Sequence, residues 1–275
     1  MSEPNPSSQN PTPRTDSGTA PHPSIQKKRR RGIYLLPNLF TTAALFAGFY
    51  AIVTAMKGDF ANASIAIFVA MVLDGMDGRI ARMTNTVSEF GVEYDSLSDL
   101  VSFGLAPSLV VYLWSISTLG KIGWLCAFFF TAATALRLAR FNTQVQTADK
   151  RYFQGLPCPA GAAVIAGLVW FGTDYGFEGD SGPWFTALIT TLVGVLMVSN
   201  IRYQSFKELD LRGRVPFVAV LAVVVVFALV SLDPPFVLFI VFACYAVSGP
   251  LMTLWLLRQR RAERRRALAN AANDT

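Results

Sequence analysis

The sequence predicts an all-α integral membrane protein, a polytopic helical bundle with about eight transmembrane helices and both termini in the cytoplasm. Of its 275 residues, 52% are hydrophobic and only 15% are charged, which is too apolar for a soluble domain of this length. Apolar stretches of about 17 to 25 residues, the length a helix needs to cross a bilayer, recur along the chain. The placement of lysine and arginine then sets the orientation.

Eight spans are expected from these apolar stretches. They cover residues 34–56, 61–82, 98–118, 122–143, 157–173, 184–201, 215–232 and 235–257. With the amino terminus inside, Lys57 and Lys121 are the only basic residues left in outer loops. Because cytoplasmic loops accumulate lysine and arginine, and an even number of spans puts both ends on one side, we expect both termini on the cytoplasmic face of the inner membrane.

The chain divides into three parts. Residues 1–32 are rich in proline and small polar residues and end in a basic run, so we expect a disordered cytoplasmic tail. Residues 33–257 form the transmembrane domain, and residues 258–275 form a second basic cytoplasmic tail. The arginines of this tail are interpreted as a stop signal that also touches anionic lipid head groups, so no nucleic-acid partner is expected.

Histidine and cysteine offer little chemistry in this sequence. His22 is the only histidine and lies in the amino-terminal tail, which argues against histidine base catalysis. Cys126, Cys158 and Cys244 are an odd number and each lies in or beside an apolar run. Their spacing fits neither a zinc site nor a disulfide framework, so we expect them to pack as small apolar residues.

Four aspartates gather near one end of the second and third spans. Asp74 and Asp77 are three residues apart, and Asp95 and Asp99 are four apart, so each pair lies on one face of a helix. A carboxylate in a bilayer is costly, and such groups are expected to face a cavity and to have a partner. Oxygen ligands without cysteine or histidine favour Mg²⁺ or Mn²⁺, and two such ions can clamp a diphosphate during phosphoryl transfer.

Small residues surround the first aspartate pair. Gly75, Gly78 and Ala81 would let a ligand approach the helix closely, with Gly78 the foremost candidate, although small residues also serve ordinary helix packing in membranes. Arg82 follows one turn after Gly78 and can hold a phosphate.

The acidic segment resembles the signature of the CDP-alcohol phosphatidyltransferase family, Asp74-x2-Asp77-Gly78-x2-Ala81-Arg82-x8-Gly91-x3-Asp95-x3-Asp99. Every fixed position is present. The resemblance implies that Asp74, Asp77 and Asp95 bind metal. It also implies that Asp99 completes the metal site and acts as general base, removing the proton of an acceptor hydroxyl that attacks the lipid-side phosphorus as CMP leaves.

The resemblance extends to residues that would bind the CDP-lipid. Family members use the first span and a hydroxyl residue shortly after the motif arginine, and Asn38, Thr41 and Ser88 match these positions. Taken alone, Asn38 and Thr41 fit a helix start that follows a proline. The family resemblance further implies a homodimer and lateral access of the lipid substrate from the inner leaflet.

The remaining inner segments resemble the branch of the family that uses L-serine as acceptor and CDP-diacylglycerol as donor. Serine carries a carboxylate, so its site should hold an arginine donor fork, which Arg137, Arg140 and Asn142 can supply. Arg137 and Arg140 also fit a plain helix end on the positive side of the membrane. Arg202 or Lys207 can instead hold a lipid phosphate.

Other functions remain open at this point. The same chemistry accommodates glycerol 3-phosphate, an inositol phosphate or choline as acceptor; phosphorylated acceptors call for more basic residues and choline for an aromatic cage. A divalent-metal transporter would also place carboxylates in the membrane, but no internal repeat is evident and the acids lie near the inner end of a span. A structural scaffold would leave the four acids without a purpose.

Overall fold

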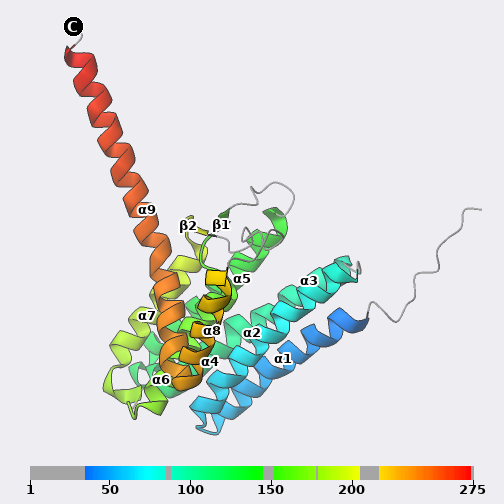
Figure 1. Ribbon diagram of the computed structural model, residues 1–275. Helices are drawn as coiled ribbons and strands as arrows, with labels where there is room; N and C mark the ends of the chain where they lie inside the picture. The colour runs from blue at the N-terminus through cyan, green and yellow to red at the C-terminus, as the bar shows by residue number, and fades with distance from the viewer. Residues whose placement is uncertain (1–34, 85–87, 145–151, 178, 205–216, 274–275) are drawn as a thin grey trace, which may run out of the picture. The chain divides into compact units, whose positions relative to one another are not determined.

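The computed structural model describes residues 35–84, 88–144, 152–177, 179–204 and 217–273 (Figure 1). The predicted amino-terminal tail lies outside the described residues. So do residues 145–151 and 205–216, which were expected to connect spans on the inner side and which include Lys207.

Nine α-helices make up most of the described chain. They are α1 (Leu35–Met56), α2 (Phe60–Met83), α3 (Glu89–Asp99), α4 (Ala106–Trp114), α5 (Lys121–Gln144), α6 (Cys158–Asp174), α7 (Pro183–Val198), α8 (Phe217–Leu232) and α9 (Pro234–Asn273). A π-helical turn, η2 (Leu100–Leu105), joins α3 to α4 without a break, and the short helices η3 (Ile116–Leu119) and η4 (Gly179–Ser181) lie in connections. Two short strands, β1 (Tyr152–Gln154) and β2 (Arg202–Gln204), pair as an antiparallel ribbon.

Every predicted span overlaps a helix, but not every helix is long enough to cross a bilayer. Five of the described helical segments have both the length and the composition, namely Pro37–Met56, Phe60–Ile80, Glu89–Trp114, Lys121–Thr143 and Pro234–Trp255. The apolar helices α6 and α7 are shorter, and α8 has only 16 residues. The structure therefore supports a helical membrane protein, while the count of eight spans remains a prediction.

The third predicted span was placed wrongly. It was expected at 98–118, whereas the continuous helix begins at Glu89 and ends at Trp114. The Ser88 hydroxyl caps its start by accepting a hydrogen bond from the Gly91 backbone N–H at 3.0 Å. Acidic residues in the first two turns lower the mean hydropathy without interrupting helical hydrogen bonds, so hydropathy alone missed this end.

Helix α1 packs against α2, α3 and η2, and the contacts with α3 and η2 are close and partly polar. Ser98 Oγ donates to the Thr41 carbonyl and Ser102 Oγ donates to the Ala44 carbonyl, each at 3.1 Å. Gly48 lies against Ser102 so closely that a Cβ at this position would overlap the Ser102 backbone. Small residues and hydroxyl donors thus let α1 fix the helix that carries two of the aspartates.

The ribbon β1–β2 lies beside α9; β1 precedes α6 and β2 follows α7 along the chain (Figure 1). Gly155, which follows β1, has a φ of +79° that suits glycine, and its N–H donates to the Ile201 carbonyl at 2.9 Å. Helix α9 itself runs for 40 residues, about 60 Å at the standard helical rise. It continues from the apolar segment through the basic residues of the predicted carboxy-terminal tail.

Candidate active site

Three of the four predicted aspartates converge. One carboxylate oxygen from each of Asp74, Asp95 and Asp99 lies within 4.8 Å of the other two. Asp74 comes from the carboxy-terminal half of α2, and the other two lie one helical turn apart on α3. The four-residue spacing places Asp95 and Asp99 on one face, and packing of α1 against both α2 and α3 brings that face to Asp74.

Asp77 lies outside this triplet but is held beside α1. Its side chain is only 5% exposed, and its Oδ2 accepts a hydrogen bond from the Thr41 hydroxyl at 2.7 Å. Thr41 also contacts the Pro37 carbonyl at 3.2 Å, within the same helix. The structure therefore gives Thr41 a direct contact with one of the predicted metal ligands.

The donor set of the triplet fits a divalent cation. Asp95 Oδ1 is buried, and no hydrogen-bond partner for it occurs among the described residues. A buried carboxylate oxygen without a partner is costly, and three carboxylates this close repel one another. Because hard oxygen ligands suit Mg²⁺ and Mn²⁺, the cluster can hold such an ion, which would offset both costs.

The two glycines of the motif face open space. Nothing lies within 4 Å of a Cβ built on Gly75 or Gly78, and both residues are exposed. Arg82 is exposed as well, and its Nε donates to the Gly78 carbonyl at 2.9 Å. Among the described residues, therefore, no neighbour requires a glycine at either position, and the surface of α2 is open there.

Asn38 and Ser88 meet at the start of α3. A Cβ built on Gly91 would lie 3.1 Å from Ser88 Oγ and 3.6 Å from Asn38 Oδ1, so both polar side chains flank this glycine. The Ser88 hydroxyl is at the same time the cap of α3. The predicted CDP-lipid residues from the first span and from the segment after the motif arginine are thus brought together.

The predicted acceptor residues lie on one stretch of α5. Asn142 Nδ2 donates to Ser96 Oγ at 3.0 Å, next in sequence to Asp95. Arg137 Nη1 contacts Cys158 Sγ at 3.1 Å, and Arg140 Nη2 donates to Asn200 Oδ1 at 2.7 Å. Arg137 Nε is buried and has no hydrogen-bond partner among the described residues, so it retains one donor for a ligand.

Sequence reasoning missed the partners of these arginines. Cys158 was expected to pack as a small apolar residue; it is buried, yet it accepts a contact from a guanidinium. Asn200 was given no role from the sequence. The paired residues are 21 and 60 positions apart in the sequence, so no local pattern could predict the pairings. The one available signal was the pair of polar residues Ser199 and Asn200 directly after an apolar stretch.

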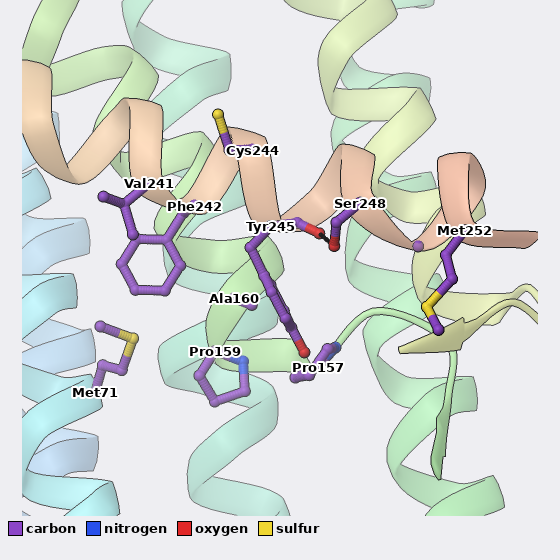
Figure 2. A pocket seen from close by; sticks show the side chains of 11 residues that line it. Met71, Pro157, Pro159, Ala160, Val241, Phe242, Cys244, Tyr245, Ser248 and Met252 are labelled. Atoms are coloured by element: carbon purple, nitrogen blue, oxygen red, sulfur yellow. Dashed lines mark hydrogen bonds between the residues drawn. The ribbon is translucent and has the colours of Figure 1, made fainter. Parts of the chain in front are cut away.

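An open apolar groove of about 700 Å³ lies between α2, the start of α6 and one face of α9 (Figure 2). Met71 of α2, one turn before Asp74, lies on one side, and Phe242 and Tyr245 of α9 lie on the other. Pro157, next to Cys158, also lines the groove. The groove therefore adjoins segments that carry both the acids and the Arg137 contact.

Comparison with known proteins identifies the family. The model of the CDP-alcohol phosphatidyltransferase family matches residues 34–199 of this chain, which is more than half of it and includes all four aspartates. The chain belongs to this family. The resemblance drawn from the signature is thereby confirmed, and the acid cluster of α2 and α3 lies within the family's domain.

Relatives of this CDP-alcohol phosphatidyltransferase include several curated bacterial enzymes. A protein of Helicobacter pylori named CDP-diacylglycerol–serine O-phosphatidyltransferase is 39% identical over 226 residues, 82% of this chain and 93% of its own. A protein of the same name from Mycobacterium tuberculosis is 33% identical over 260 residues, 86% of this chain and 89% of its own. One from Bacillus subtilis is 34% identical over 173 residues, 63% of this chain and 92% of its own.

Neutralising Asp95 should weaken Mn²⁺ binding. We expect Asp95→Asn to raise the Mn²⁺ dissociation constant of the purified protein by about tenfold or more, because one charged oxygen ligand is lost. Electron paramagnetic resonance titration of free Mn²⁺ measures this directly. Glu93→Gln removes a carboxylate from the same helix at an exposed position and should leave binding unchanged. Equal affinity in both variants would exclude Asp95 as a ligand.

Proposed function

We propose that this protein transfers the phosphatidyl group of CDP-diacylglycerol to L-serine, forming phosphatidylserine and CMP. The observation that carries the proposal is a match of 39% identity across 93% of a relative named for this reaction, together with the carboxylate triplet. Membership of the family supports the donor class, and the names of the relatives support the acceptor. The reaction is a step of phospholipid synthesis.

Asp99 is the proposed general base. The serine hydroxyl oxygen forms a new bond to the lipid-side phosphorus of the diphosphate, and the bond from that phosphorus to the CMP oxygen breaks. Asp99 takes the hydroxyl proton, and CMP leaves with the bonding electron pair. The ordinary pKa of a carboxyl group is far below that of an alcohol, so Asp99 is a weak base for this proton. It can take the proton only as the new bond to phosphorus forms, and neutralisation of the diphosphate charge by nearby cations favours that bond.

Asp74, Asp77, Asp95 and Asp99 are proposed to hold two Mg²⁺ or Mn²⁺ ions. When bound, the ions supply charge neutralisation of the diphosphate and orient its oxygens. Thr41 keeps the Asp77 carboxylate in place through its 2.7 Å hydrogen bond. The orphaned oxygen of Asp95 and the mutual approach of the triplet support this assignment.

The donor lipid is proposed to bind along α1 and α2. Gly78 and Gly75 leave the surface of α2 open to the cytidine nucleotide, and Arg82 lies one turn further on to meet a phosphate. Asn38, Thr41 and Ser88 complete this side of the site. The apolar groove between α2 and α9 has the size and lining to take an acyl chain (Figure 2).

The acceptor is proposed to bind on the α5 side. Serine presents a carboxylate to Arg137, whose Nε keeps a donor, and to Arg140. Asn142 connects this stretch of α5 to α3 by its hydrogen bond to Ser96. The serine hydroxyl would thus point from α5 towards the acid cluster, as the reaction requires.

The protein is proposed to lie in the cytoplasmic membrane with its active site and both termini on the cytoplasmic face. The five apolar helices support the membrane location, and the basic residues of the inner connections and of the carboxy-terminal end of α9 support the orientation. A homodimer and the full set of eight spans remain predictions from the family resemblance and the hydropathy pattern.

The acceptor is tested by CMP release from CDP-diacylglycerol with Mn²⁺ or Mg²⁺. Serine should give rapid release with phosphatidylserine as product, whereas glycerol 3-phosphate, an inositol phosphate and choline should give only background. Release with one of the latter alone would replace the acceptor and keep the chemistry. Absence of metal-dependent release with all four would overturn the proposed function.

Asp99→Asn should lower the turnover rate by about 100-fold or more, because a positioned base typically contributes that much. Much of the binding of CDP-diacylglycerol should persist, since the direct donor contacts proposed above come from α1, α2, Ser88 and the apolar groove and not from Asp99. Single-turnover CMP release and equilibrium lipid binding separate the two effects. Glu93→Gln serves as the matched control, and a wild-type rate in Asp99→Asn would refute the base assignment.

Filling the groove should impair use of long acyl chains. Ser248 is exposed and lines the groove, so Ser248→Trp should raise the KM for a long-chain CDP-diacylglycerol by about tenfold while affecting a dioctanoyl analogue much less. Val247→Trp introduces the same side chain at the next exposed position of α9, which does not line the groove. Equal effects of the two variants would exclude the groove as an acyl site.

A further inference from the structure

Helix α9 contains a proline whose missing hydrogen bond is replaced from another part of the chain. Pro250 lies inside α9 and has no N–H to donate to the carbonyl four residues earlier, that of Ala246. That carbonyl accepts a hydrogen bond from the Tyr203 hydroxyl at 2.9 Å. Tyr203 comes from β2, so a side chain of the ribbon occupies the place left by the proline.

The contact is buried and tightly shaped. Tyr203 is 1% exposed and Ala246 is 4% exposed, so water does not satisfy the carbonyl in their place. A Cβ on Gly249 would overlap the Tyr203 ring, which shows that the absence of a side chain at this position lets the ring reach α9. The ring also lies against Tyr245, with 5.6 Å between centroids.

The same ribbon leads to both arginines proposed to bind the acceptor. Cys158, which contacts Arg137, follows β1 by four residues, and Asn200, which accepts from Arg140, precedes β2 by two. Arg137 and Arg140 are three apart and share a face of α5. The residues that adjoin one end of the ribbon therefore contact the two guanidiniums, while its middle residue Tyr203 is attached to α9.

We propose that Tyr203 is a positioning residue for the acceptor site, acting through the hydrogen bond that it supplies to the carbonyl freed by Pro250. This inference rests on the proposed function of Arg137 and Arg140. The bond fixes the ribbon to α9, and the ribbon then fixes the partners of the two arginines. The acids lie on α2 and α3, apart from the ribbon. Tyr245 and Gly249 line the apolar groove proposed for the donor, and loss of the Tyr203 hydroxyl alone keeps the ring that packs against them. We therefore expect removal of this hydrogen bond to act on acceptor binding.

The experiment is a double-mutant cycle. Tyr203→Phe keeps the ring but removes the donor, and we expect the KM for serine to rise by roughly five- to tenfold, with kcat and the KM for CDP-diacylglycerol within about twofold of wild type. Pro250→Ala restores an N–H at position 250. In the Pro250→Ala background the N–H of residue 250 can donate to the Ala246 carbonyl, so adding Tyr203→Phe should change the KM for serine less than twofold.

A matched control uses Tyr175, which follows the carboxy-terminal end of α6, whereas the ribbon adjoins the amino-terminal end of that helix. Tyr175 donates a hydrogen bond to Asp233 just before α9, and Tyr175→Phe removes a hydroxyl of the same kind. It should leave the KM for serine unchanged. A similar rise in Tyr175→Phe would mean that the effect is general loosening of α9, and the proposal would fail.

Two further outcomes decide the proposal. An unchanged serine KM in Tyr203→Phe, or an equal rise with and without Pro250→Ala, would overturn it. If Tyr203→Phe alone yields no folded protein, Pro250→Ala and the double variant are compared, and an acceptor KM that differs more than twofold between them would equally overturn it. If the wild-type protein shows no serine-dependent CMP release, that result counts against the proposed function and not against the role of Tyr203. If the wild-type protein uses another acceptor, the same mutant cycle is measured on the KM for that acceptor.

Discussion

The structure depends on bringing several carboxylates together within apolar helices. Asp74, Asp95 and Asp99 approach within 4.8 Å, and Asp77 lies one turn from Asp74 on α2. Such a cluster is unfavourable in a membrane unless a cation and firm hydrogen bonds compensate for it. The packing of the surrounding helices holds the four carboxylates in one geometry.

Helix α1 has the central part in holding that arrangement. Its Thr41 donates to Asp77 through the side chain and accepts from Ser98 through the backbone carbonyl, so one residue connects the two acid-bearing helices. Gly48 and Ser102 permit the close approach that this requires. In a membrane, where apolar burial discriminates little between helix partners, small residues and hydroxyl bonds decide which helices pack.

The proposed acceptor side is organised differently, by segments far apart in sequence. Arg137 and Arg140 project from α5 to partners that flank the ribbon, and the ribbon is attached to α9 by Tyr203. The acid cluster is thus built from α2 and α3, while the proposed acceptor site draws on α5 and on the partners of its arginines beside the ribbon.

The sequence by itself determined the helical membrane character, the family and the four aspartates, because hydropathy, helical spacing and the signature are all local patterns. It misplaced the third span, since the acids of α3 lower hydropathy while the Ser88 cap still starts a helix at Glu89. Only the tertiary structure decided which three aspartates converge, that Thr41 holds the fourth, and that Cys158, Asn200 and Tyr203 have polar roles. These depend on contacts between residues 21 to 60 positions apart, which arise from helix packing and leave no periodic trace in the chain.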